Sequence, residues 1–208
     1  SNPRVEAPVL NARLRKRWLK GGFRAAMIGP KADLTFQHEW LGDQASVLAD
    51  IAAGTHPFFQ VLKNAQKPAI IVGQGAATRE DGAAILALAG KVAEAAGMIT
   101  DGWNGFNVLH TAAARVGGLD IGFVPQAGGK DTAAILAGAQ SGEISVVLLA
   151  GADEIDMTGL GDAFVVYLGT HGDAGAHRAD VVLPTAAYTE KNATYVNTEG
   201  RVQRTRLA

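Results

Sequence analysis

The chain has 208 residues, enough for one large α/β domain or two small ones, and 48% of them are hydrophobic, so it can bury a sizeable core. Its 19 Lys and Arg nearly balance its 20 Asp and Glu to a net charge of −1, so neither nucleic acid nor an anionic membrane is expected as a partner, and no apolar stretch approaches the roughly 20 residues that span a bilayer. The absence of cysteine excludes a disulfide, a thiolate nucleophile, a cysteine-ligated iron–sulfur cluster and a cysteine-based zinc site.

In the first half of the chain, apolar residues at helical spacing alternate with short apolar runs. Leu10, Leu14 and Trp18 recur every four residues, and a glycine pair ends the helix that they predict. Helices are predicted over residues 9–20, 43–53, 57–65 and 80–96. Strands are predicted over residues 24–28, 68–72 and 98–100.

The second half continues the alternation and ends differently. Helices are predicted over residues 107–116 and 132–140, with Asp131 capping the latter, and strands over residues 144–150, 164–168 and 181–183. Beyond Pro184, residues 194–196 and 201–203 predict a hairpin with a four-residue turn that ends in Gly200. The alternation predicts an α/β fold with a mostly parallel sheet and helices on its faces.

A glycine-rich turn follows the strand predicted at 68–72. Gly73 and Gly75 stand where a dinucleotide fingerprint has its first two glycines, in front of a helix whose amides would bind pyrophosphate. Thr78 replaces the third glycine, and no acidic residue follows at the usual spacing. The turn is a candidate for nucleotide binding, and a tight strand–helix turn of small residues is the favoured interpretation.

A second candidate crevice lies beyond the strand predicted at 144–150. Gly151 and Asp153 follow this strand, and the carboxyl ends of strands line the ligand crevice in open α/β sheets. An acidic side chain there would bind ribose hydroxyls or a metal, whereas hydrogen bonding within the loop is the favoured role.

Other patterns are weaker. Residues 128–132 resemble a phosphate-binding loop, but Asp131 stands in place of the magnesium-binding hydroxyl, which favours a capped helix. His171 lies in a loop with Asp173 and His177, yet no two of the five histidines have the spacing of a helical metal pair. A basic run is interpreted as a solvated helix face, with a subunit contact as the alternative; it comprises Arg13, Arg15, Lys16, Arg17 and Lys20.

The C-terminal segment resembles the molybdopterin oxidoreductase superfamily. The chain reads Ala-Asp-Val-Val-Leu-Pro at 179–184, Glu-Lys at 190–191 and Asn-Thr-Glu-Gly-Arg at 197–201. The superfamily typically has Ala-Asp-Val-Val-Leu-Pro, Glu-Lys and Asn-x-Glu-Gly-Arg. Residues 2–4 and 7–10 also look like the segment after that family's phosphate-proximal Gly-Thr.

One departure narrows the resemblance. Molybdenum enzymes usually carry Gly where this chain has Ala193, and the family of large iron–sulfur subunits of respiratory complex I is similar to the chain there. That family also resembles the chain at residues 11–16, 33–35, 41–43, 81–86 and 171–176, so the matches cover nearly the whole chain.

The resemblance implies a three-layer Rossmann-like parallel sheet of the formate dehydrogenase/DMSO reductase type, with a C-terminal hairpin or extended tail. It implies a helical and short-strand portion over residues 1–66, a Rossmann-like α/β domain over 67–186, and a hairpin tail over 187–208 that leads to a further C-terminal part.

The resemblance also implies a role. In that family the [2Fe–2S] and [4Fe–4S] clusters lie in an N-terminal region outside this chain, and the region similar to this chain generally holds no molybdenum cofactor. A cofactor-free and metal-free, non-catalytic scaffold is therefore expected. It would pack against the cluster domain and other peripheral-arm subunits, while the whole complex transfers electrons from NADH to quinone. The alanine-rich composition favours a bacterial source, which implies the cytoplasmic side of the inner membrane.

Two alternatives stay open. One is a fragment of a molybdenum or tungsten oxidoreductase that still binds the pterin dinucleotide at the glycine turns. The other is an FAD- or NAD-binding α/β module, because residues 67–73 also resemble the middle domain of thiamine-diphosphate enzymes. If a vestigial nucleotide crevice remains, its candidate residues are Gly73, Gly75, Gly151, Asp153 and His171.

Overall fold

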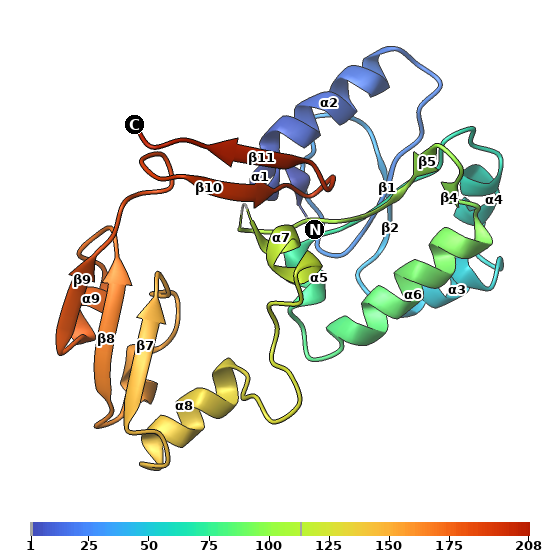
Figure 1. The fold of residues 1–208 in the computed structure, drawn as a ribbon. Helices are drawn as coiled ribbons and strands as arrows, with labels where there is room; N and C mark the ends of the chain where they lie inside the picture. Colours follow the sequence, from blue (N-terminus) through green and yellow to red (C-terminus); the bar gives the residue numbers. More distant parts are fainter. Residues whose placement is uncertain (1, 113) are drawn as a thin grey trace. The chain divides into compact units, whose positions relative to one another are not determined.

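The computed structural model of the chain describes residues 2–112 and 114–208. The chain divides into two compact units, Ser1–Ala113 and Ala114–Ala208, both drawn in Figure 1. The segment 67–186, predicted as one Rossmann-like domain, therefore contributes residues to both units. Helices alternate with mainly parallel strands within each unit, so the predicted α/β class is confirmed.

The first unit consists of helices and short strand pairs. Its helices are α1 (Pro3–Glu6), α2 (Pro8–Leu19), α3 (Ser46–Ala52), α4 (Phe58–Lys63), α5 (Gln74–Ala77) and α6 (Gly82–Ala95). Its strands are β1 (Ala26–Ile28), β2 (Glu39–Gly42), β3 (Ile70–Val72), β4 (Ile99–Thr100), β5 (Trp103–Asn104) and β6 (Phe106–Val108). The pairs β1–β2 and β3–β6 are parallel, and β4–β5 is an antiparallel hairpin.

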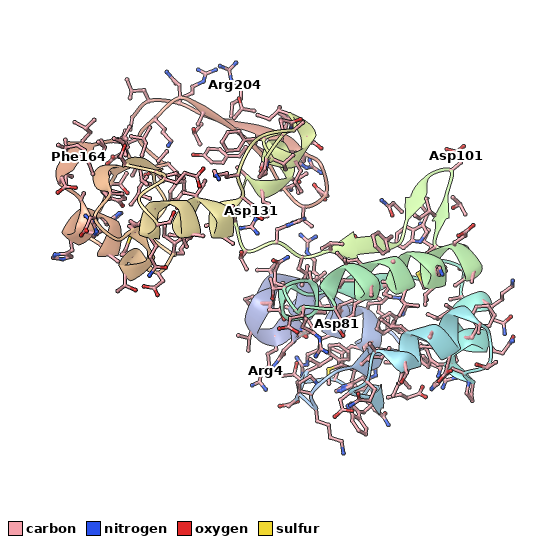
Figure 2. All side chains as sticks on the ribbon, turned by 90° about the horizontal axis from the view of Figure 1, so that it is seen from below. Arg4, Asp81, Asp101, Asp131, Phe164 and Arg204 are labelled. Carbon is pink, nitrogen blue, oxygen red and sulfur yellow. The ribbon has the colours of Figure 1, made fainter. Side chains whose placement is uncertain are left out.

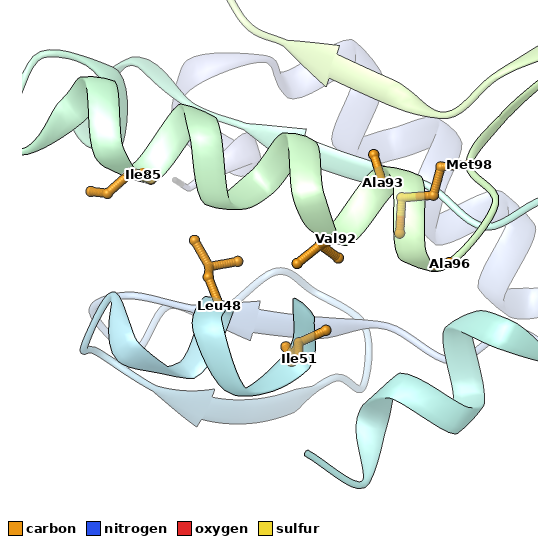
Figure 3. Packing of buried hydrophobic residues seen from close by; sticks show 7 residues of the cluster. All are labelled: Leu48, Ile51, Ile85, Val92, Ala93, Ala96 and Met98. Carbon is orange, nitrogen blue, oxygen red and sulfur yellow. The ribbon is translucent and has the colours of Figure 1, made fainter. Parts of the chain in front are cut away.

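The main core of the first unit lies between α3 and α6. Leu48 and Ile51 of α3 face Ile85 and Val92 of α6, as Figure 3 shows. The apolar stripe predicted for the long helix is therefore the face that α6 buries. Ile70 packs against the same cluster, so this core also positions β3 and the turn that follows it.

The second unit contains a three-stranded parallel sheet and a terminal hairpin. Its helices are α7 (Arg115–Asp120), α8 (Thr132–Gln140), the 3-10 helix η1 (Met157–Leu160) and α9 (Ala174–Arg178). Its strands are β7 (Val146–Ala150), β8 (Phe164–Gly169), β9 (Val181–Pro184), β10 (Ala193–Val196) and β11 (Val202–Thr205). Strands β7, β8 and β9 lie side by side in sequence order and run in the same direction (Figure 1).

In β7 and β8 one face of the sheet is buried and the other is mostly exposed, whereas all four residues of β9 are exposed. Side chains alternate along β7, so that Val147 and Leu149 are buried while Val146 and Leu148 are exposed. The buried face packs against α8, η1 and α9, whose residues join the same cluster. This alternation follows from the two-residue period of a strand.

The predicted helix over residues 107–116 is wrong. Residues Phe106–Val108 form β6, paired in parallel with β3, and helix α7 begins only at Arg115; residue 113 lies outside the described residues. This segment is a strand because its backbone pairs with β3, where Ile70 N donates to the Gly105 carbonyl at 2.8 Å. A Cβ on Gly105 would overlap with the Pro68 carbonyl oxygen, so only glycine permits this close approach of the two segments.

The terminal hairpin is confirmed, with five residues, 197–201, between its strands in place of the four predicted. β10 and β11 are antiparallel and end with Val196 opposite Val202. Gly200 has a φ of 80°, and its N–H donates to the Asn197 carbonyl at 2.9 Å, which closes the turn. The positive φ explains why glycine occupies this position.

Candidate functional site at the ends of the parallel strands

Gly73 and Gly75 lie at the turn between β3 and α5. Gly73 is the N-cap residue of α5, with φ −89° and ψ 164°, and Gly75 lies inside this four-residue helix. Neither has a positive φ, and a Cβ on Gly75 would have no heavy atom within 4 Å. The local backbone therefore does not require glycine at either position.

The first amide of α5 is paired with a carboxylate of the same unit. Gln74 N donates to Glu6 Oε2 at 3.1 Å, and Asn2 N donates to Glu6 Oε1 at 2.9 Å. Gln74 Nε2 donates to the carbonyl of Leu109, just beyond β6. Amides at the start of a helix attract anions, so the Glu6 carboxylate occupies the position that a phosphate would take at this turn.

The candidates in the second unit follow neighbouring strands. Gly151 comes directly after β7, has a φ of 66° and donates its N–H to the Leu168 carbonyl at 2.7 Å. Asp153 is half-buried two residues later. His171 follows β8, is exposed, and has its Nδ1 2.7 Å from Thr170 Oγ1. Because β7 and β8 are parallel neighbours, the fold brings Gly151, Asp153 and His171 to the same edge of the sheet.

The ring of Tyr167 is packed at this edge. Tyr167 is only 3% exposed, and a Cβ added to Gly169 would overlap with its Cζ, Cε1 and Oη atoms. A Cβ added to Gly175 of α9 would lie 2.7 Å from Tyr167 Cε2 and 3.4 Å from Asp153 Cβ. The ring therefore lies between the end of β8 and α9, beside Asp153.

Tyr167 is not suited to act as a base. Burial raises the pKa of its phenol, and the nearby carboxylates of Asp153 and Asp173 raise this pKa further. The hydroxyl consequently keeps its proton at neutral pH. Among the described residues the hydroxyl has no hydrogen-bond partner, so the role of the Tyr167 side chain is to fill space at the strand ends.

The glycine-rich loop before α8 leads into a capped helix, as predicted. Asp131, labelled in Figure 2, accepts a hydrogen bond at Oδ1 from Ala134 N at 2.8 Å. Lys130 forms an ion pair with Glu143 at 3.0 Å. Both charged groups are engaged within the second unit, which agrees with the capped helix and not with a phosphate loop.

The remaining candidates do not assemble into a site. Within residues 2–112 and 114–208, no three His, Asp or Glu side chains are placed to hold a metal ion, so His171 and His177 do not belong to such a group. In the basic run, Arg15 Nε donates to the Thr35 carbonyl at 3.1 Å and Arg17 Nη1 donates to the Gly21 carbonyl at 2.8 Å. These two arginines therefore stabilise the turns next to α2.

Sequence reasoning missed Glu6 and Tyr167. Glu6 is 68 residues away from Gln74, and no local pattern connects them. For Tyr167 a signal was present: it alternates with Val165 on the buried side of β8, and Gly169 follows at the next position on the same side. A bulky ring two residues before a glycine in a buried strand indicates that the ring lies over the glycine.

Parallel strands, flanking helices and glycine turns at the strand ends thus define an α/β protein in which protein side chains lie at those turns. The chain belongs to the molybdopterin oxidoreductase family, whose model matches residues 1–208.

The relatives narrow this class, and the resemblance to the large iron–sulfur subunits is confirmed. The NADH-ubiquinone oxidoreductase 75 kDa subunit of Reclinomonas americana is 44% identical over 208 residues, which is 100% of this chain and 30% of that protein. An NADH-quinone oxidoreductase subunit of Rickettsia bellii (strain RML369-C) is 43% identical over 203 residues, 98% of this chain and 28% of that protein; its counterpart in Rickettsia prowazekii (strain Madrid E) gives the same values. The chain thus spans less than a third of the length of these relatives. Among the helices of the described residues, none is both long and apolar enough to cross a membrane.

Proposed function

We propose that this chain is a region of the large iron–sulfur subunit of an NADH–quinone oxidoreductase, complex I, and serves there as a scaffold without a cofactor of its own. The observation that carries the proposal is the identity of 43–44%, over at least 98% of the chain, to subunits of NADH-ubiquinone and NADH-quinone oxidoreductases. Transfer of electrons from NADH to quinone then belongs to the whole complex. Its [2Fe–2S] and [4Fe–4S] clusters lie in another region of the subunit, and the lack of cysteine here supports that division of roles because thiolates hold such clusters.

The residues at the candidate turns do not fit the phosphorylated pterin that the family name mentions. A phosphate at the start of α5 would meet the Glu6 carboxylate, which already accepts the Gln74 N–H. A nucleotide at the ends of β7 and β8 would meet the buried ring of Tyr167. These two contacts favour the scaffold over a molybdopterin-, FAD- or NAD-binding enzyme.

The exposed face of the β7–β8–β9 sheet supports a role in packing. Its side chains are apolar and exposed; they include Val146, Leu148, Phe164, Val181 and Leu183. Contiguous apolar surfaces of this kind mark places that another protein surface covers. In the proposal, the cluster-bearing region of the same subunit and other peripheral-arm subunits provide that cover, on the cytoplasmic side of the bacterial inner membrane.

Cofactor analysis of the native complex tests the proposal. The complex with its full-length subunit would be purified from the source organism, molybdenum and tungsten quantified by mass spectrometry, and pterin measured by fluorescence after oxidation. A known molybdoenzyme processed in parallel serves as the control. We expect far less than one metal and one pterin per subunit; one of each per subunit would refute the scaffold and favour the enzyme.

A further inference from the structure

We infer that Tyr167 is an aromatic plug that closes the ligand crevice at the ends of β7 and β8, and that Gly169 and Gly175 form the seat of its ring. The inference deepens the proposed function, because it explains how this edge of the sheet is kept without a ligand. In open α/β sheets this edge is where ligands bind. Here β8 carries Tyr167, and the loops that follow β7 and β8 surround its ring.

The Tyr167 ring explains why glycine occupies both position 169 and position 175. Neither Gly169 nor Gly175 has a positive φ, so the backbone alone would accept another residue at each position. Glycine weakens a strand or a helix, and its presence at the end of β8 and inside α9 therefore needs a reason. The ring supplies it from both sides: a Cβ on Gly169 would overlap with the outer atoms of the ring, and a Cβ on Gly175 would lie 2.7 Å from Cε2 and 2.8 Å from Cδ2.

The surroundings of the Tyr167 ring indicate that it fills the crevice and does not take part in a reaction. Tyr167 belongs to the cluster of buried residues beneath the sheet, together with Leu149 and Val165, so its ring continues the core outward to the strand ends. Its hydroxyl has no hydrogen-bond partner in the part of the chain that the structure describes. Tyr167→Phe should therefore keep the closed edge, whereas a small side chain should open a cavity of the size and shape of a phenol ring.

A double-mutant cycle in the full 208-residue chain tests the seat. Gly169→Ala would be made with Tyr167 present and in a Tyr167→Leu background, and hydrogen exchange of the peptide that contains β8 would be measured. With Tyr167 present, we expect the methyl group to speed exchange roughly 10-fold or more, because it overpacks the core. In the Leu background the same change should alter exchange less than about 2-fold.

Two further variants complete the cycle. Gly172→Ala is the matched control, because Gly172 lies between Gly169 and Gly175, has no positive φ and has no heavy atom within 4 Å of an added Cβ. Gly175→Ala makes a milder contact with the ring and replaces Gly169→Ala if that variant does not fold. Equal effects of the alanine in the Tyr and Leu backgrounds would overturn the plug.

Phenol provides an independent readout. At millimolar concentration it should slow exchange of the β8 peptide in Tyr167→Ala, and leave the wild-type chain and Tyr167→Phe unchanged. Protection of the wild type, or no protection of Tyr167→Ala, would contradict a closed crevice shaped for a ring. Pterin bound to the native full-length subunit would instead refute the proposed function, so the two failures are distinguishable.

Discussion

Thr35 has a backbone conformation that β-branched residues avoid. Its φ is 67°, and no other non-glycine residue in the described ranges has a positive φ. Three contacts hold the turn: Thr35 N donates to Asp33 Oδ1 at 2.8 Å, Arg15 Nε donates to the Thr35 carbonyl at 3.1 Å, and Asn11 Nδ2 donates to the Leu34 carbonyl at 3.0 Å. The helix α2 thus maintains a conformation that is unfavourable for threonine by itself.

Replacing Thr35 should separate this conformational cost from the loss of the side chain. Thr35→Gly and Thr35→Ala both remove the hydroxyl and the methyl group, and only glycine relieves the positive φ. We expect the glycine variant to exceed the alanine variant by about 1 kcal/mol in free energy of unfolding. Tryptophan fluorescence in a urea titration measures this, because all three tryptophans, Trp18, Trp40 and Trp103, belong to the first unit. Equal stability of the two variants would show that the turn is unstrained.

Asp33 makes the same turn sensitive to acid. The hydrogen bond from Thr35 N, followed by the Arg4 guanidinium at 2.7 Å, holds the pKa of the Asp33 carboxyl below its ordinary value of 3.8. A carboxyl whose pKa is lowered in the folded state stabilises that state fully above its unfolded pKa, and this contribution is lost as the pH falls through the folded pKa. Stability should therefore decline below about pH 4 partly through Asp33.

Asp33→Asn tests this contribution. Urea unfolding between about pH 2 and pH 6 should show a shallower loss of stability for the variant than for the wild type. Asp101→Asn, in the turn of the β4–β5 hairpin, removes one carboxylate without this hydrogen bond and serves as the control. Parallel pH profiles for Asp33→Asn and the wild type would contradict the assignment.

The start of helix α8 depends on one side chain. Asp131 satisfies the Ala134 N–H at 2.8 Å, and its carboxylate lies at the positive end of the helix. Asp131→Ala should cost about 1 kcal/mol of local stability, and Asp131→Asn should retain most of it because the amide oxygen still accepts. Hydrogen exchange of the peptide over residues 132–140 would report the loss, and identical exchange in the alanine variant would exclude a capping role.

Elements with a clear local pattern were predictable from sequence, and the short strand β6 was not. Helix α6 and the terminal hairpin follow from local patterns that agree with their environment: an apolar face at helical spacing, and a turn with glycine at the required φ. β6 has three residues and no such pattern, and its strand conformation depends on β3, 36 positions earlier in the register of Ile70 with Phe106. A still longer separation, 68 residues, hides the contact between Glu6 and Gln74.

For the complete chain, the alternation of helices and strands indicated the α/β class, and the sequence resemblance indicated the family. The division into two compact units was not predicted, because the alternation of helices and strands continues across the junction near residue 113 and the nearest Gly- and Pro-rich stretch, residues 117–129, lies beyond it. Nor does the apolar run of β7 reveal that only one of its faces is buried. A continuous Val-Val-Leu-Leu run is typical of a strand covered on both faces, and the exposed Val146 and Leu148 depart from that expectation.

The exposed sheet face yields a prediction for the assembled protein. Leu148 is 62% exposed, so Leu148→Lys should change the stability of the 208-residue chain by less than about 0.5 kcal/mol. In the full-length subunit the same change should reduce incorporation into the complex, because a lysine would be buried without a partner when the face is covered. Val202→Lys in β11 is the matched control, since Val202 is also exposed and lies outside this face. Native gel electrophoresis of the complex would detect the difference, and normal assembly of the Leu148 variant would show that the face stays uncovered.

The contact of Tyr167 with Gly169 and Gly175 also restricts how the sequence can diverge. If a larger residue replaces either glycine while Tyr167 is still present, the resulting protein has an overpacked core. If the ring is lost first, the intermediate instead contains a void, and the glycine positions then become free to vary. The order of substitutions is therefore constrained, and descendants that have lost the aromatic residue are the ones in which larger residues should appear at the two glycine positions.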